Sequence, residues 1–158
     1  MLIRPFTPDD ADAVAALFHL SVRGAAIRDY SAAQVAAWSP APPEASAYVR
    51  KAADRTFLVA VNDDGAIIGY GDLEADGHID HLYCHPDVVG TGVGAAIYAA
   101  LEDAAFEAGM ARLFVEASEA ARRLFERRGF RVDGRNDLTI NGVAIHNYRM
   151  SKTLARPA

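Results

Sequence analysis

The sequence predicts a single α/β (α+β) domain that is built on a mixed, mainly antiparallel seven-stranded sheet. The chain has 158 residues, which is the usual size of one domain. Hydrophobic residues make up 51% and charged residues 23%, values that are ordinary for a globular protein and argue against disorder. The hydrophobic pattern also changes between short strand-like runs and helical repeats of three or four residues.

The first third of the chain is predicted to be mostly helical. Residues 2–6 read as a short strand, and Pro5 suits the edge of a sheet because it cannot donate a ladder hydrogen bond. A helix should follow, with Thr7 as its capping residue. Further helices are expected over 31–38 and near 45–53. This region should therefore cover the sheet rather than extend it.

The middle of the chain changes to a strand pattern. Three strands are expected over 57–61, 66–74 and 79–84. The segment 62–65 has the composition of a hairpin turn, and 75–77 forms a second turn. Such short connections make neighbouring strands antiparallel.

The last third brings one crossover and a final hairpin. A glycine-rich loop precedes a long helix over about 92–108, and a helical crossover makes the next strand, 112–116, parallel to the strand before it. The remaining predicted elements are a helix over 119–128 capped by Ser118 and the strands 131–140 and 143–150. The domain is expected to span 1–154, with a C-terminal tail at 155–158.

Charge and cysteine content exclude several classes of function. The net charge is −5 with no basic run, so no nucleic acid partner is expected. Cys84 is the single cysteine, which excludes a disulfide framework and fits a reduced, cytoplasmic setting. No apolar run approaches the roughly 20 residues that cross a membrane, and 1–5 does not resemble a signal peptide. The histidines at 78, 81 and 85 have uneven spacing, so no metal site is expected.

Three glycines alternate at the start of the long helix, in the stretch Val89-Gly90-Thr91-Gly92-Val93-Gly94. Glycine lets a ligand approach the backbone, and free amides at a helix N-terminus favour an anion. This pattern favours a pyrophosphate site over a plain tight turn. A dinucleotide fingerprint is an alternative, carried by Gly90, Gly92, Ala95 and Glu116. Against it, 85–89 separates the strand from the glycines.

The element order and two motifs resemble the GNAT-type N-acetyltransferases over nearly the whole chain. The resemblance is strongest from 79 to 94 and again from 116 to 130. Gly92 and Gly94 match the family's pyrophosphate loop, Gln/Arg-x-x-Gly-x-Gly/Ala, whereas Val89 stands where Gln or Arg is usual. The resemblance implies a single GNAT-like domain with helices on both faces of the sheet, and a gap between two parallel strands.

The resemblance also implies acetyl-CoA as co-substrate and no metal. The implied cofactor-binding residues lie on a strand edge, in the glycine loop and at the next helix: Leu82, Tyr83, Cys84, Val89, Gly90, Thr91, Gly92, Val93, Gly94, Ala95 and Ser118. A backbone amide of the strand edge would polarise the thioester oxygen. The basic residues at 122, 123, 127 and 128 read as a solvated helix face or, alternatively, as contacts to the 3′-phosphate of coenzyme A.

Two residues are predicted to be catalytic. Asp80 stands where family members often carry a carboxylate base, and half-burial on a strand is expected to raise its pKa. The alternative is a solvated charge or a pair with His81. Phe125 occupies the position of the usual tyrosine acid, and a phenyl ring donates no proton. Tyr83, or else Tyr148 or water, would then protonate the leaving thiolate.

The function implied is transfer of an acetyl group from acetyl-CoA to a primary amine by direct attack on the thioester. The acceptor would be a small molecule or a peptide, and a homodimer through the final hairpin is plausible. Two alternatives stay open: a non-catalytic acyl-CoA binding or sensor domain, motivated by Phe125, and a small dinucleotide-binding module.

Overall fold

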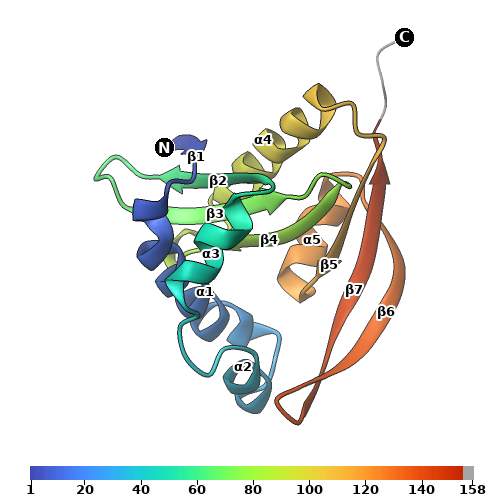
Figure 1. Cartoon of the computed structure of the whole chain (residues 1–158). Coiled ribbons are helices and arrows are strands. Elements are labelled where there is room, and N and C mark those ends of the chain that lie inside the picture. Colours follow the sequence, from blue (N-terminus) through green and yellow to red (C-terminus); the bar gives the residue numbers. More distant parts are fainter. Residues whose placement is uncertain (155–158) are drawn as a thin grey trace.

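Seven strands and five α-helices make up the computed structural model, which describes residues 1–154 (Figure 1). The expected tail, 155–158, lies outside the described residues. The strands are β1 (Leu2–Pro5), β2 (Thr56–Val61), β3 (Ile67–Leu73), β4 (His78–Cys84), β5 (Arg112–Ala117), β6 (Arg131–Ile140) and β7 (Val143–Thr153). The helices are α1 (Ala11–Gly24), α2 (Ala32–Trp38), α3 (Ala45–Ala52), α4 (Val93–Glu107) and α5 (Glu119–Arg127).

The strands form one mixed sheet in the order β1-β2-β3-β4-β5-β7-β6. The pairing is antiparallel throughout the described residues except between β4 and β5, which α4 connects. The prediction of a mainly antiparallel seven-stranded sheet is thus confirmed. A single parallel pair does not make the doubly wound sheet of a dinucleotide-binding fold.

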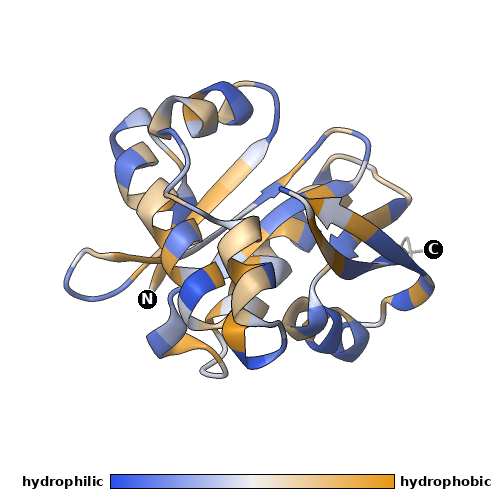
Figure 2. Cartoon of the chain, turned by 90° about the horizontal axis from the view of Figure 1, so that it is seen from below, coloured by the Kyte–Doolittle hydropathy of each residue, from blue (hydrophilic) through white to orange (hydrophobic). Residues whose placement is uncertain are grey.

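Helices cover both faces of the sheet, as expected. On one face α4 and α5 pack against a cluster that includes Leu73, Ile79 and Leu113. On the other face α1 and α3 cover Phe57 and Tyr70. Figure 2 shows hydrophilic and hydrophobic residues interspersed along the helices, the pattern of helices with one face on a sheet. None of the helices in residues 1–154 is long and apolar enough to cross a membrane.

The chain starts its helices with local signals that the sequence carries. Thr7 forms a capping box with Asp10, although a 3₁₀ turn over Pro8–Asp10 comes first and α1 begins at Ala11. Ser31 caps α2 by accepting a hydrogen bond from the amide of Gln34. Ser118 caps α5 in the same way. Predicted and observed boundaries therefore agree to within a few residues, with the first helix the largest difference.

A β-bulge interrupts β4 where the predicted catalytic aspartate lies. The register pairs Gly71 with Leu82 but Leu73 with Ile79, so that two residues, Asp80 and His81, oppose Asp72 alone. A bulge bends its strand and increases the local twist.

Beyond the bulge, β4 leaves its parallel neighbour. β4 and β5 pair only at His78 with Phe114 and at Ile79 with Val115. The segment from Asp80 to Cys84 keeps its partner β3 on one side and has no partner strand on the other. The expected gap between two parallel strands is present, and the bulge lies at its branch point.

Candidate active site

The glycine loop ends in a set of backbone amides without partners. Gly92 is the N-cap of α4 and has a φ of 96°, a conformation that residues with a side chain rarely adopt. Five backbone amides in the glycine loop and the first turn of α4 donate no hydrogen bond within residues 1–154. They are those of Gly90, Gly92, Val93, Gly94 and Ala95. Free amides at the positive end of a helix suit an anion.

Two residues of the predicted loop have another role. The amide and the hydroxyl of Thr91 both donate to the carbonyl of Val88, at 3.1 Å and 2.5 Å. The side chain of Val93 is buried in the core. Thr91 therefore shapes the loop, and Val93 contributes only its amide.

A groove of about 380 Å³ runs from this loop to the open edge of β4. Its lining comes from β4, the glycine loop and α5: Leu82, Tyr83, Cys84, Val88, Val89, Gly90, Gly92, Gly94, Ala95, Ser118, Ala120, Ala121, Leu124, Arg127 and Arg128. Nine predicted cofactor-binding residues are among them. Arg127 and Arg128, and not Arg122 or Arg123, supply positive charge there.

The open edge of β4 presents two particular amides to the groove. The amides of His81 and His85 donate toward β3, to Asp72 Oδ1 at 2.6 Å and to the Ile68 carbonyl at 2.8 Å. Because backbone donors alternate in direction along a strand, the amides of Leu82 and Cys84 point to the other side. That side faces the gap left by β5.

A second cleft, of about 140 Å³, opens on the other side of the branch point. It shares Leu82, Tyr83, Ser118 and Ala121 with the groove. Its further lining comes from the α1–α2 region, the β4, β5, β6 and β7 strands and α5: Tyr30, Trp38, Asp80, Val115, Glu116, Phe125, Leu138, Ile140, Ile145, His146 and Asn147. The two openings meet in the gap between β4 and β5.

Tyr83 lies where the groove and the cleft meet. Its ring is held by Phe18, Trp38 and His81, with centroid distances of 4.9, 6.4 and 5.2 Å. Its hydroxyl has no hydrogen-bond partner in residues 1–154, although that atom is not sealed from solvent. Burial raises the pKa of Tyr83, so the hydroxyl keeps its proton at neutral pH.

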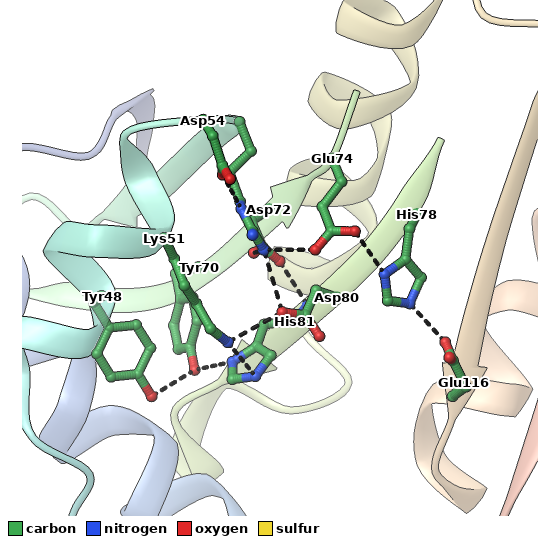
Figure 3. A network of polar contacts seen from close by, with 11 residues as sticks. Tyr48, Lys51, Asp54, Tyr70, Asp72, Glu74, His78, Asp80, His81 and Glu116 are labelled. Carbon is green, nitrogen blue, oxygen red and sulfur yellow. Dashed lines mark hydrogen bonds and ion pairs between the residues drawn. The ribbon is translucent and has the colours of Figure 1, made fainter. Parts of the chain in front are cut away.

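Asp80 faces the cleft but is ion-paired. Its Oδ2 lies 3.0 Å from Lys51 Nζ and 3.3 Å from Arg55 Nη1 (Figure 3). Burial alone would raise the pKa of Asp80, but the charge interaction with His81, followed by the hydrogen bond and charge of Lys51, leaves that pKa below its usual value. The expectation of a raised pKa was wrong, because the strand pattern does not reveal the Lys51 ammonium that α3 brings to the carboxylate. A carboxylate of this kind holds a cation better than it accepts a proton.

Asp72 fixes the bulge from the neighbouring strand. Its carboxylate is fully buried, accepts the amide of His81 at 2.6 Å and pairs with Arg55 at 3.0 Å. Burial raises the pKa of Asp72. The sequence analysis missed Arg55, whose only signal is its position directly before a strand.

The histidine of the bulge connects this network to two buried tyrosines. Lys51 donates to His81 Nε2 at 3.2 Å, so the ring proton lies on Nδ1, 2.9 Å from the Tyr70 hydroxyl. Tyr70 Oη lies 3.4 Å from Tyr48 Oη (Figure 3). His81 is thus a neutral ring held at both nitrogens. No group of His, Cys, Asp or Glu in the described residues has the arrangement of a metal site.

Phe125 and Cys84 are apolar wall residues. The ring of Phe125 is fully buried between Tyr98 and Phe130, at centroid distances of 5.7 and 4.8 Å. It forms the floor of the cleft without a donor group. Burial raises the pKa of the Cys84 thiol to about 11, so this cysteine is not a nucleophile near neutral pH.

This architecture is that of acetyl-CoA-dependent acetyltransferases. It combines a split mixed sheet, free amides at a helix N-terminus, and a groove that reaches a second cleft through the split. The chain belongs to the GNAT acetyltransferase family: the model of the acetyltransferase (GNAT) domain matches residues 26–152. The protein is accordingly an acetyltransferase enzyme.

Individual relatives agree with this assignment. The chain is 28% identical to the uncharacterized N-acetyltransferase YafP of Escherichia coli (strain K12), over 94% of this chain and 93% of that protein. The structure of a GCN5-related N-acetyltransferase from Rhodopseudomonas palustris has a TM-score of 0.88 and 36% identity, covering 97% and 95% of the two chains. YncA of Salmonella typhimurium, solved with acetyl-CoA, shares the fold at a TM-score of 0.76 and 20% identity, covering 100% and 96%.

The first prediction concerns His81. Burial and the Lys51 ammonium lower its pKa to about 4, against about 6.5 in an unfolded chain. NMR should therefore show a neutral His81 ring at about pH 5.5, with His81→Gln identifying the signal. Between the two pKa values the unfolded state binds more protons, so acidification through that window should lower the free energy of unfolding. A His81 midpoint near 6.5 would contradict the network.

Proposed function

We propose that this enzyme transfers the acetyl group of acetyl-CoA to a primary amine by direct attack on the thioester. The observation that carries the proposal is the junction of two openings at Leu82 and Tyr83. A long ligand in the groove would bring its reactive end to the place where a second ligand enters from the cleft. Direct transfer needs such a meeting point, because holding both reactants in position makes the step effectively unimolecular.

The groove fits acetyl-CoA in three ways. The amides from Gly90 to Ala95 other than that of Thr91 are free and suit its pyrophosphate. Backbone amides bind regardless of side chain, which offsets Val89 in place of Gln or Arg. Leu82 and Cys84 offer amides to the amide groups of the pantetheine arm. Arg127 and Arg128 line the groove and can meet the 3′-phosphate, since guanidinium groups suit phosphate oxygens.

The transfer then needs three groups. An amide of the β4 edge, from Leu82 or Cys84, stabilises the oxyanion that forms when the amine nitrogen attacks the carbonyl carbon. The C–S bond breaks, and Tyr83 donates a proton to the leaving thiolate. Asp80, with its lowered pKa, attracts and positions the cationic acceptor. Ser118 caps α5 and lines both openings.

The acceptor is proposed to be a small-molecule or peptide amine with positive charge. The charged side chains that line the cleft are the carboxylates of Asp80 and Glu116, and His146 is the basic group among its lining residues. A cytoplasmic location and a homodimer through the β6–β7 hairpin stay predictions.

The proposed activity is tested by a coenzyme A release screen over small amines, polyamines, aminoglycosides, amino acids and peptides. We expect release to depend on one of the cationic amine classes. Acetyl-CoA binding without release for any of these classes would instead favour the sensor function that Phe125 suggested.

Gly92→Val should weaken acetyl-CoA binding by at least about tenfold, because a β-branched residue is strained at a φ of 96° and would displace the free amides. Isothermal titration calorimetry measures the affinity. Gly142→Val is the matched control: Gly142 has a φ of 78°, lies in the remote β6–β7 turn and has open space around it. Equal affinities of the two variants would argue against the loop as the pyrophosphate site.

Tyr83→Phe should lower kcat by about 10²-fold, the size of a lost general acid, while acetyl-CoA affinity stays nearly the same. Steady-state coenzyme A release measures kcat. Tyr48→Phe is the control, since Tyr48 is buried outside the groove and the cleft. Unchanged kcat in Tyr83→Phe would assign thiolate protonation to water.

A further inference from the structure

Glu116 places a carboxylate in the cleft, and one of its two oxygens is not hydrogen-bonded within residues 1–154. It follows the last β4–β5 pair, Ile79 with Val115, and lines the cleft with Asp80. Its side chain is 46% exposed. Oε2 accepts a hydrogen bond from His78 Nε2 at 2.6 Å, and Oε1 has no partner in residues 1–154. In contrast to Asp80, no lysine or arginine of the described residues forms an ion pair with it.

His78 bridges the branch point of the sheet. Its Nε2 meets Glu116 on β5, and its Nδ1 lies 3.1 Å from Glu74 Oε2, directly after β3 (Figure 3). The ring also stacks on Phe114 with a centroid distance of 4.9 Å. Burial lowers the pKa of His78, but its hydrogen bonds to Glu116 and Glu74 outweigh this and raise the pKa above the ordinary value. The two carboxylates therefore favour the protonated form of the imidazole.

The reaction under the proposed function leaves one proton to be removed. An ammonium acceptor loses two protons when it becomes an amide, and the departing thiolate takes up one. The remaining proton needs an acceptor that contacts the amine and an outlet to solvent. The lowered pKa of Asp80 makes it a weak candidate for this step.

We propose that the Glu116–His78 pair removes this proton, with Glu116 as the catalytic residue that contacts the amine and His78 as the positioning residue. The proton passes from the ammonium nitrogen to the carboxylate of Glu116, which frees the lone pair for attack on the thioester carbon. A protonated His78 pairs its positive charge with the carboxylate and weakens it as a base, so the pair is ready to accept the proton of the amine once His78 has lost its own. The inference rests on the proposed function, because it names the base for that reaction.

The surroundings of the pair are charged on every side. β3 contributes Glu74, which pairs with Arg55 at 2.9 Å. β4 contributes Asp80. β7 places Arg149 opposite Glu116, but its guanidinium donates to Asn136 at 3.2 Å. β5 places Arg112 over the ring of Phe114. Tyr30, Tyr83 and His146 line the same cleft. In the described residues none of these groups is hydrogen-bonded to Glu116, whose hydrogen-bond partner is His78.

The test compares Glu116→Gln with Glu126→Gln in coenzyme A release at several pH values. Glu126 is a matched control: its side chain is 45% exposed and pairs with Arg122 at 2.6 Å, outside both openings. Glu116→Gln should lower kcat by about 10²-fold at pH 7 without changing acetyl-CoA affinity. The deficit should shrink as pH approaches the pKa of the free amine, about 10.4 for a lysine-like acceptor, because the amine then needs no base.

His78→Gln is the second variant. It should move the acidic limb of the kcat/KM profile to lower pH, because the imidazole that must first lose its proton is then absent. A Glu116→Gln deficit that is absent or equal at all pH values would overturn the assignment, and so would an unmoved acidic limb in His78→Gln. A wild-type enzyme that releases no coenzyme A with any amine would overturn the proposed function itself, and this inference with it.

Discussion

The hydrogen bond from the His81 amide to the buried carboxylate of Asp72 is the interaction on which the site depends. It satisfies a backbone donor that the bulge would otherwise leave unpaired, and an unpaired buried donor is costly. Arg55 balances the charge of the carboxylate from beside β2. With the bulge held in this way, β4 bends away from β5 after only two paired positions.

The open strand edge and the junction of the two openings follow from that bend. The amides of Leu82 and Cys84 lose a partner strand and become available to a ligand. The opening joins a groove that begins at the glycine loop to a cleft walled by the last hairpin. The same network separates the carboxylates by their contacts: Asp72 supports the backbone, Asp80 forms an ion pair with Lys51 through Oδ2, and Glu116 has one oxygen without a partner in the described residues. Position on the sheet, rather than residue type, separates these three.

The elements and the glycine loop at the start of α4 could be predicted from the sequence because their signals are local. Hydrophobic period, capping by Ser31 and Ser118, and the glycines at 90 and 92 each act within a few residues. The bulge, the direction of each β4 amide and the pKa of Asp80 could not be predicted in this way. The bulge and the amide directions depend on Asp72 of the neighbouring strand, and the pKa of Asp80 depends on His81 and on Lys51, which is 29 positions away in the chain. In the sequence Glu116 stands out only as part of a dinucleotide fingerprint. Its hydrogen bond to His78 could not be predicted, because the two residues are neighbours in the sheet and not in the sequence.

A crystal structure of the protein with acetyl-CoA tests the central claim most directly. The account predicts the pyrophosphate on the amides of Gly90 to Ala95, hydrogen bonds from Leu82 and Cys84 to the pantetheine arm, and the thioester within reach of the Tyr83 hydroxyl. Acetyl-CoA bound elsewhere, or β4 and β5 drawn together along their full length with the arm excluded, would contradict it.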